Sequence, residues 1–321
     1  MKPVKRASSF YSKKTLIQRK KPPKIEPKAI RTVRDGGCAG TARGPERKLF
    51  LKGVPMVRVA CEMCGSETTE RVYTDNGPGY ERCVHCGLVY QNPQPKLDDV
   101  KSIYNENYFE YEVSNHSNFF SLMKRGLADI RFDALTQKFV RRRILDIGCA
   151  TGLLLNHLKE QGWDSYGVEI CHESAEYAAE EFGLTVFESK LEDVHFPDCH
   201  FDVVHLSHLI EHVPHPRELI EEIYRVLIPG GYMILTTPNI DGMAARLYGE
   251  DWRCVMDQHL YLFSKKTMKR MVEDAGFTVS RQISWGSLPV EKNPSPLLKK
   301  ITDRMVKLLN VGDVMLLLCE K

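Results

Sequence analysis

The chain has 321 residues, 42% of them apolar, so it is long enough for two domains and a sizeable buried core. No apolar run approaches the ~20 residues that a membrane-spanning helix needs, and the basic N-terminus is not followed by the apolar segment of a signal peptide. Ten cysteines in a chain of this length do not indicate a secreted disulfide scaffold. We therefore expect a cytoplasmic protein without a membrane span.

Charge divides the chain into two unlike parts. The net charge is +3, but residues 1–60 hold 17 Lys and Arg against 3 Asp and Glu, whereas residues 61–321 hold 28 against 39. Residues 1–55 are basic, poor in apolar side chains and without periodicity, which predicts a disordered extension. This segment is either a solvated or non-native extension or a contact for nucleic acid or an anionic surface. Met56 is an alternative start, because the first ordered-looking segment begins there.

Four cysteines in two pairs follow the extension. Cys61, Cys64, Cys83 and Cys86 form the pattern C-x2-C-x18-C-x2-C, which lies within the spacing typical of zinc sites. The two-residue gap lets one tight turn bring both sulfurs of a pair onto one ion, and four thiolates close a tetrahedral shell without an open position. The pattern predicts a structural zinc ion in a zinc ribbon over residues 56–95. Redox use of the pairs is the alternative, and two matched pairs disfavour it.

An aromatic segment, residues 96–140, follows the ribbon. Four aromatic residues fall within eight positions: Tyr104, Tyr108, Phe109 and Tyr111. They form either a helix face that covers the core or a lid over a bound cofactor. A helix is predicted from about Phe119 to Phe139.

The remaining part, residues 141–321, alternates between strand and helix patterns. Strands are expected near 144–147, 164–169, 185–188, 202–206, 231–237, 277–284 and 313–319, and helices near 151–161, 173–182, 216–227 and 264–275. This alternation predicts an α/β fold, in which helices cover both faces of a mostly parallel sheet.

The first strand of this part ends in a glycine-containing turn. The run Ile144–Ile147 stops at Gly148-Cys149-Ala150-Thr151-Gly152, and leucines at helical spacing follow. Such a turn presents free backbone N–H groups at the carboxyl edge of a sheet, where adenosine-type cofactors bind. The next strand ends in Glu169, whose carboxylate can accept hydrogen bonds from both ribose hydroxyls. A dinucleotide dehydrogenase is the alternative, but the G-x-G-x-x-G step is absent.

Three blocks in order resemble class I S-adenosylmethionine (SAM)-dependent methyltransferases. The glycine turn, preceded by Asp146 and followed by Glu169, is similar to their motifs I and II, and residues 201–213 and 228–235 are similar to their fourth and fifth strand regions. The resemblance covers roughly residues 140–285. It implies a Rossmann-like, doubly wound sheet of seven strands, mostly parallel, in which the last strand is antiparallel.

The same resemblance implies which residues bind SAM. The turn would hold the methionine and ribose portions of SAM, and the helix after the third strand would hold the adenine edge. The expected cofactor-binding residues are Asp146, Gly148, Ala150, Gly152, Glu169, Leu191, Glu192 and Ser207. Ala150 replaces the middle glycine of the family, and we expect this turn to tolerate alanine if φ stays negative.

Three histidines are the candidate catalytic residues. His208, Glu211 and His212 have the spacing of one helical face, and His259 precedes a later helix. The set resembles a constellation in ubiquinone-pathway O-methyltransferases and plant small-RNA 2′-O-methyltransferases that can hold a divalent cation, although an acid replaces His208 there. We expect either a general base at His212 or His259, or a second divalent ion near Glu211 and His212 that is softer than Mg²⁺. A structural role is the alternative, with Glu211 as a helix cap.

The expected function is SAM-dependent methyl transfer to oxygen or carbon of a small metabolite, such as a sugar or quinone-like compound. Zinc-ribbon heads also occur in methyltransferases that resemble those acting on small metabolites. The first alternative is an RNA methyltransferase that binds its substrate with the basic tail and ribbon; the acidic body and weakly charged ribbon disfavour it. The second is a non-catalytic SAM-binding partner subunit.

Overall fold

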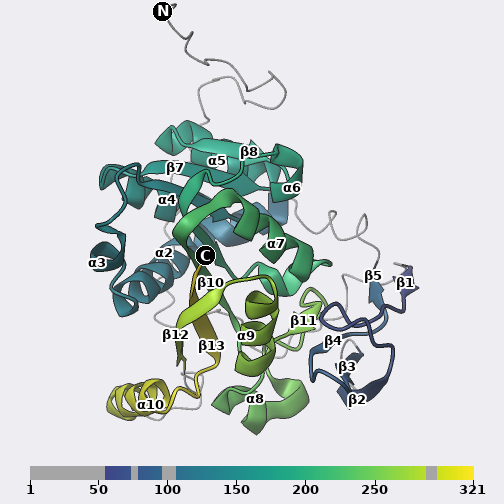
Figure 1. Cartoon of the computed structure of the whole chain (residues 1–321). Coiled ribbons are helices and arrows are strands. Elements are labelled where there is room, and N and C mark those ends of the chain that lie inside the picture. The colour runs from purple at the N-terminus through teal and green to yellow at the C-terminus, as the bar shows by residue number, and fades with distance from the viewer. Residues whose placement is uncertain (1–54, 74–78, 96–105, 287–294) are drawn as a thin grey trace, which may run out of the picture.

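The computed structural model describes residues 55–73, 79–95, 106–286 and 295–321 (Figure 1). The strands are β1 (Met56–Val57), β2 (Thr69–Tyr73), β3 (Tyr80–Cys83), β4 (Val89–Gln91), β5 (Gln94–Pro95), β6 (Arg143–Ile147), β7 (Asp164–Glu169), β8 (Thr185–Glu188), β9 (Phe201–Ser207), β10 (Leu227–Pro238), β11 (Tyr261–Leu262), β12 (Thr278–Trp285) and β13 (Val314–Glu320). The helices are α2 (Glu106–Asp129), α3 (Phe132–Thr136), α4 (Leu153–Glu160), α5 (His172–Phe182), α6 (Leu191–Val194), α7 (Pro216–Val226), α8 (Met243–Tyr248), α9 (Lys265–Asp274) and α10 (Pro296–Leu309), with 3₁₀ turns η3 (Ile210–His212) and η4 (Gly249–Asp251).

A seven-stranded sheet forms the centre of the molecule, in the order β12-β13-β10-β9-β6-β7-β8. Strands β6 to β10 pair in parallel, whereas β13 lies between β10 and β12 and is antiparallel to both. This topology confirms the predicted Rossmann-like sheet with an antiparallel last strand. It brings the carboxyl ends of β6, β7 and β9 to one edge, as parallel pairing requires.

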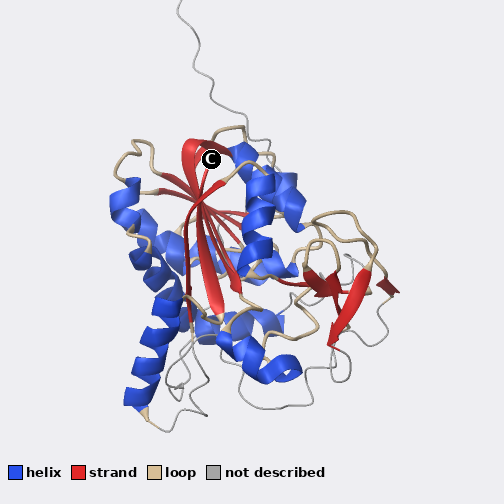
Figure 2. Cartoon of the chain, turned by 60° about the horizontal axis from the view of Figure 1, so that its bottom comes forward, coloured by secondary structure: helices blue, strands red, loops and turns tan. Residues whose placement is uncertain are grey.

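Helices cover both faces of this sheet (Figure 2). Because side chains alternate across a strand, Leu145 and Val204 belong to one buried apolar cluster, while their neighbours Ile144 and Val203 belong to the other. The first cluster packs against α6, α7 and α9, and the second against α2, α3, α4 and α5. Two apolar layers, one on each face, therefore hold the sheet in place.

The helix before the sheet differs from the prediction. Helix α2 begins at Glu106 and ends at Asp129, rather than running from Phe119 to Phe139, because Arg131 adopts a left-handed conformation (φ 57°) before α3. In the aromatic segment, Tyr104 lies outside the described residues, and the Phe109 ring packs 5.8 Å from that of Tyr177 in α5. The role of this segment as a lid stays a prediction. None of the described helices is both long and apolar enough to cross a membrane.

The N-terminal cysteine module packs against the α/β domain. Its four-stranded sheet has the order β11-β4-β3-β2, so that its edge strand β11 comes from the C-terminal half of the chain. Figure 1 shows β11 between the module and α9. Tyr80 and Val89 of the module share a buried cluster with Trp252 and Leu262, and Cys83 belongs to the main core cluster. The predicted boundary near residue 95 stays a prediction, but the two parts share their apolar cores.

Candidate functional site

The turn after β6 is built from left-handed residues. Gly148 (φ 69°) and Gly152 (φ 77°) both have positive φ, the region that favours glycine. A Cβ atom on Gly152 would lie 2.7 Å from Leu184 Cδ1 and 2.8 Å from Ala178 Cβ, so a larger residue would clash with the packed side chains. The turn can therefore approach its neighbours closely only with glycine at this position.

Ala150 does not keep the negative φ that we expected. Its φ is 49°, and its backbone N–H donates to Glu169 Oε2 at 3.0 Å. Left-handed backbone costs an L-residue about 1–2 kcal/mol, because Cβ comes close to the following carbonyl oxygen. Because φ is positive, alanine does not replace glycine here without backbone strain. The hydrogen bond to Glu169 and the two flanking glycines hold the turn in this shape.

Glu169 lies at the carboxyl end of β7 and is buried. Its Oε1 accepts a hydrogen bond from the Cys171 N–H at 2.8 Å, and its Oε2 accepts the one from Ala150. Burial raises the pKa of its carboxyl group, although the hydrogen bonds from Cys171 and Ala150 oppose this shift. Each carboxylate oxygen has a second lone pair, so the same group can also accept hydrogen bonds from ribose hydroxyls.

Asp146 has a partner that sequence reasoning missed. Its Oδ1 lies 2.7 Å from Nδ1 of His205, and both residues are buried. The two residues are opposite each other in neighbouring parallel strands, β6 and β9, a register that only the folded sheet defines. This pairing orients the Asp146 carboxylate at the base of the glycine turn.

The other expected cofactor residues lie at the same edge of the sheet. Leu191 is buried and Glu192 is exposed at the start of α6, which follows β8, and Ser207 is half-buried at the end of β9. Their contacts with SAM stay predictions.

The candidate residues that follow β9 do not lie on the single helical face that we expected. His208 has a left-handed conformation (φ 53°) and lies before the short turn η3, so His208, Glu211 and His212 do not share one helical face. His208 Nδ1 is nevertheless 3.2 Å from Glu211 Oε1. A Cβ atom on Gly148 would lie 3.3 Å from Leu209 Cδ1, which shows that this segment packs directly against the glycine turn.

Glu211 is completely buried within the turn η3. Its Oε2 accepts a hydrogen bond from the Thr237 hydroxyl at 2.9 Å, a contact that the sequence did not indicate. Burial acts to raise the pKa of its carboxyl group, but the hydrogen bond and charge of His208 keep it below its ordinary value. Glu211 is therefore a buried carboxylate anion.

His212 and His259 lie together, with ring centroids 4.7 Å apart. Nδ1 of His212 is 2.8 Å from the Gln258 carbonyl oxygen, and Nδ1 of His259 is 2.9 Å from the Cys254 carbonyl oxygen. A carbonyl oxygen only accepts, so each Nδ1 carries a hydrogen and each neutral ring keeps its lone pair on Nε2. Burial lowers the pKa of both rings, that of His259 to about 3, which favours this neutral form.

Three of these side chains could hold a metal ion. One ligand atom from each of Glu211, His212 and His259 lies within 4.8 Å of the others. One carboxylate oxygen and two imidazole nitrogens suit a borderline divalent transition metal. The carbonyl acceptors on Nδ1 are the partners that metal-bound histidines ordinarily have. The donor set therefore fits the predicted second ion.

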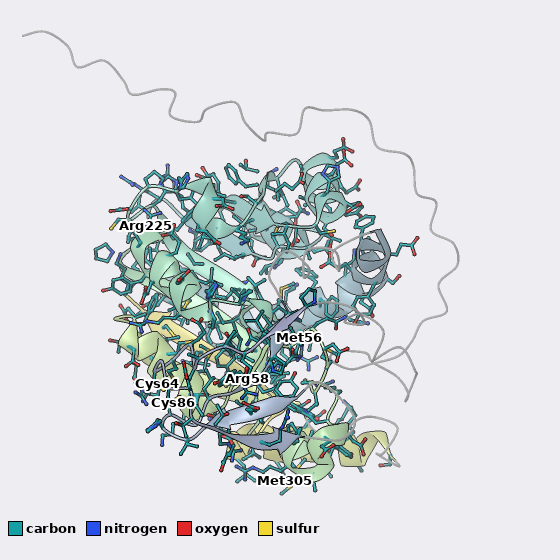
Figure 3. The ribbon with its side chains drawn as sticks, turned by 90° about the vertical axis from the view of Figure 1, so that its right-hand side faces the viewer. Met56, Arg58, Cys64, Cys86, Arg225 and Met305 are labelled. Carbon is teal, nitrogen blue, oxygen red and sulfur yellow. The ribbon has the colours of Figure 1, made fainter. Side chains whose placement is uncertain are left out.

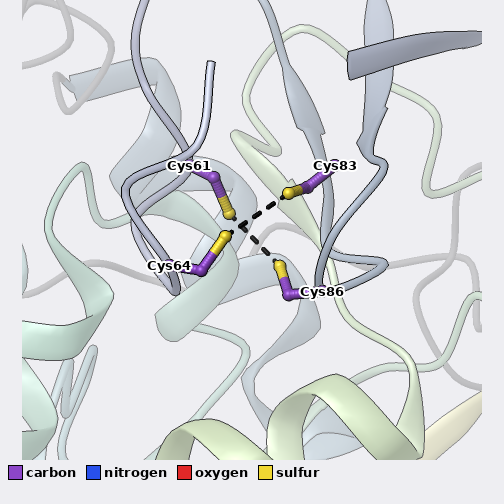
Figure 4. Close-up of side chains that lie close together, drawn as sticks. All are labelled: Cys61, Cys64, Cys83 and Cys86. Carbon is purple, nitrogen blue, oxygen red and sulfur yellow. Dashed lines mark hydrogen bonds between the residues drawn. The ribbon is translucent and has the colours of Figure 1, made fainter. Parts of the chain in front are cut away.

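The four cysteines form a separate cluster (Figure 4). All four thiols are free, with Sγ–Sγ distances of 3.4 Å between Cys61 and Cys86 and 3.5 Å between Cys64 and Cys83. These distances approach the ~3.8 Å between sulfurs that share one tetrahedral zinc ion. Burial acts to raise the pKa of the Cys83 thiol, but backbone N–H groups of Cys86 and His85 lower it to about 7. The residues fit a zinc ion bound by four thiolates.

Comparison with known proteins agrees with this geometry. The family described as "Methyltransferase domain" matches residues 119–282, just over half of the chain. The ubiquinone biosynthesis O-methyltransferase of Psychrobacter arcticus is 26% identical over 152 residues, which are 43% of this chain and 59% of that protein. The one of Methylococcus capsulatus is 32% identical over 104 residues, which are 30% of this chain and 44% of that protein. The chain thus spans less than two thirds of the length of these curated relatives.

A SAM-dependent methyltransferase of Archaeoglobus fulgidus is a structural neighbour, with 23% sequence identity and a TM-score of 0.48 over 67% of this chain and 99% of that one. The family match spans β6 to β10, and with them the glycine turn, Glu169 and the histidine cluster. The chain therefore belongs to the methyltransferase-domain family.

Proposed function

We propose that the chain transfers the methyl group of SAM to a hydroxyl oxygen of a small metabolite, and that His212 and His259 act on the acceptor. The observation that carries the proposal is a pair of neutral imidazoles held by carbonyl oxygens. One of them, His212, lies three residues after Leu209, whose side chain packs against Gly148 of the glycine turn. The matched relatives are named O-methyltransferases, which favours an oxygen acceptor over carbon.

Methyl transfer to a hydroxyl requires that the oxygen lose its proton and lie in line with the sulfonium methyl group. The lone pair on Nε2 of either histidine can accept this proton. The imidazolium so formed is stabilised by the buried anion of Glu211, which Thr237 and His208 hold in place. The turn at residues 148–152 and Glu169 would position SAM opposite this cluster.

A divalent ion is the second candidate for the same cluster, because the ligand atoms of Glu211, His212 and His259 converge. When bound there, such an ion would polarise the acceptor hydroxyl and make it more acidic. A lone pair that binds an ion cannot accept a proton at the same time. The two roles therefore predict different responses to chelators.

The charge of the cysteine module supports a small acceptor rather than RNA. Arg58 pairs with Glu81 at 2.9 Å, and Arg82 lies 3.6 Å from Glu70. Cations that acids already pair contribute little to phosphate binding. The zinc ion that we propose for the four cysteines has a closed ligand set, so its role is structural.

The test is transfer of labelled methyl from SAM into a cell extract, with His259→Ala and, as the matched control, His157→Ala on α4. We expect label in small solutes, a 10²- to 10⁴-fold lower kcat for His259→Ala, and unchanged SAM affinity. The control should behave as wild type, because the His157 ring contacts Gln161 and Phe120, away from the cluster. Label lost on nuclease treatment, or full turnover by His259→Ala, would contradict the proposal.

Treatment of the wild-type enzyme with a chelator separates the two roles. Loss of turnover that a divalent ion restores, while the zinc bound to the cysteines stays constant, indicates the metal role. Unchanged turnover indicates a general base.

A further inference from the structure

We infer that the cysteine module positions the active-site histidines, with Tyr80 and Gln91 as the positioning residues. Both side chains hold the loop 256–260, which carries His259 and also fixes His212. The inference deepens the proposed function and rests on it for the role of the two histidines, but its geometry is independent of the acceptor.

Tyr80 belongs to β3 and is completely buried. Its hydroxyl donates to the carbonyl oxygen of His259 at 2.6 Å and lies 3.0 Å from that of Met256. The hydroxyl thus joins the cysteine module directly to the backbone of a candidate catalytic residue. A buried hydroxyl between carbonyl oxygens holds the loop because loss of the bond leaves a buried acceptor unpaired.

Gln91 belongs to β4 and is also completely buried. Its side-chain Nε2 donates to the carbonyl oxygen of Asp257 at 2.9 Å and lies 3.2 Å from that of Met256. Its backbone N–H donates to the Leu260 carbonyl oxygen at 2.8 Å. One residue of the module therefore contacts the loop at both of its ends.

The opposite side of the loop contacts the histidine cluster. The Gln258 carbonyl oxygen accepts from His212 Nδ1, and the Leu260 N–H donates to the Glu211 carbonyl oxygen at 2.8 Å. All five carbonyl groups from Met256 to Leu260 therefore have partners, four of them in the module and one in His212. A shift of this loop would move His259 and remove the acceptor that sets the hydrogen position on His212.

The two positioning residues are attached to the cysteine cluster through short strands. Strand β3 ends at Cys83, and β4 begins three residues after Cys86. The Cys83 N–H donates to the Leu88 carbonyl oxygen at 2.8 Å, which closes the turn between the strands. Figure 3 views the molecule from this side and labels Cys64 and Cys86. Cross-linking of the four sulfurs by zinc would thus fix Tyr80 and Gln91 relative to each other.

Tyr80→Phe and Tyr90→Phe form a matched pair for the test. Both tyrosines are completely buried on neighbouring strands, and each variant removes one oxygen atom. The Tyr90 hydroxyl has no hydrogen-bond partner within the described parts of the chain, whereas that of Tyr80 contacts the loop. A difference between the two variants therefore reports the contact with the loop and not the loss of a buried oxygen.

The experiment measures hydrogen exchange of peptides that cover residues 254–263, together with kcat and the Kd for SAM, in the full chain. For Tyr80→Phe we expect faster exchange in this peptide, unchanged exchange over 143–147 and 201–207, and a tenfold to hundredfold lower kcat. The Kd for SAM should stay as in wild type. Tyr90→Phe should match wild type in every measurement.

Gln91→Met is the second variant, since it keeps the length of the side chain and removes its donor. Removal of zinc from the wild-type chain, checked by metal content, should raise exchange over 254–263 in the same way. Equal exchange in Tyr80→Phe and Tyr90→Phe, with unchanged exchange in Gln91→Met, would overturn the inference. Lack of turnover by wild type on any acceptor would overturn only the proposed function, because exchange does not depend on turnover.

Discussion

Replacement of Ala150 by glycine should stabilise this protein, although alanine-to-glycine changes ordinarily destabilise. Ala150 has a φ of 49° and is half-buried in the turn after β6. Glycine adopts this conformation without the steric conflict that an L-residue has there. The backbone hydrogen bond from residue 150 to Glu169 is independent of the side chain and should persist.

The expected magnitude follows from two opposing effects. Relief of left-handed strain contributes about 1–2 kcal/mol to the free energy of unfolding. The greater freedom of glycine in the unfolded chain removes about 0.4–1 kcal/mol. We therefore expect Ala150→Gly to raise the free energy of unfolding by about 0.5–1 kcal/mol, and the melting temperature by about 1–4 °C.

The control is Ala179→Gly, which makes the same chemical change in the interior of α5 at another half-buried position. It should lower the free energy of unfolding by about 1 kcal/mol, the usual cost of glycine in a helix. Urea unfolding of wild type and both variants shows directly whether each variant has a higher or a lower free energy of unfolding. Destabilisation of Ala150→Gly equal to that of the control would refute the reasoning about left-handed strain at residue 150.

Two further predictions concern the candidate binding residues. Glu169→Gln should weaken SAM binding at least about tenfold in calorimetry, because an amide cannot accept hydrogen bonds on both of its polar atoms; unchanged affinity would exclude Glu169 from ribose recognition. Cys83→Ser should remove one zinc ion per chain, measured by elemental analysis, and lower the free energy of unfolding by about 3 kcal/mol. The exposed Cys199 provides its control, since Cys199→Ser should keep both metal and stability; metal retained by Cys83→Ser would contradict the zinc assignment.

Local patterns along the sequence predicted the fold well, because hydrophobic periodicity reflects which face of each element is buried. Predicted strands such as 164–169 and 185–188 agree with β7 and β8 residue for residue. The start of α2 was placed too late, because the aromatic segment before Phe119 was interpreted as a separate helix face or lid. Its end was missed because one left-handed residue, Arg131, interrupts the helix.

The candidate site depended more strongly on the tertiary structure. The sequence indicated that Glu211, His212 and His259 are chemically suited to one another. However, Glu211 lies 46 positions before Asp257, which belongs to the loop that carries His259. The partners Thr237 and Cys254 and the pairing of Asp146 with His205 come from other strands and loops. Contacts of this kind leave no periodic pattern, because they depend on register and on chain crossings rather than on local spacing.

By itself the sequence determined the α/β class, the glycine turn and the cysteine pairs, because each depends on residues close together in the chain. Only the tertiary structure decided that Ala150 is left-handed, that Glu211 is buried, and that the cysteine module contacts the loop of His259. The physical reason is the same in all three cases. Backbone conformation in a turn, burial and long-range hydrogen bonds follow from how distant elements pack together, and no single segment of the chain contains that information.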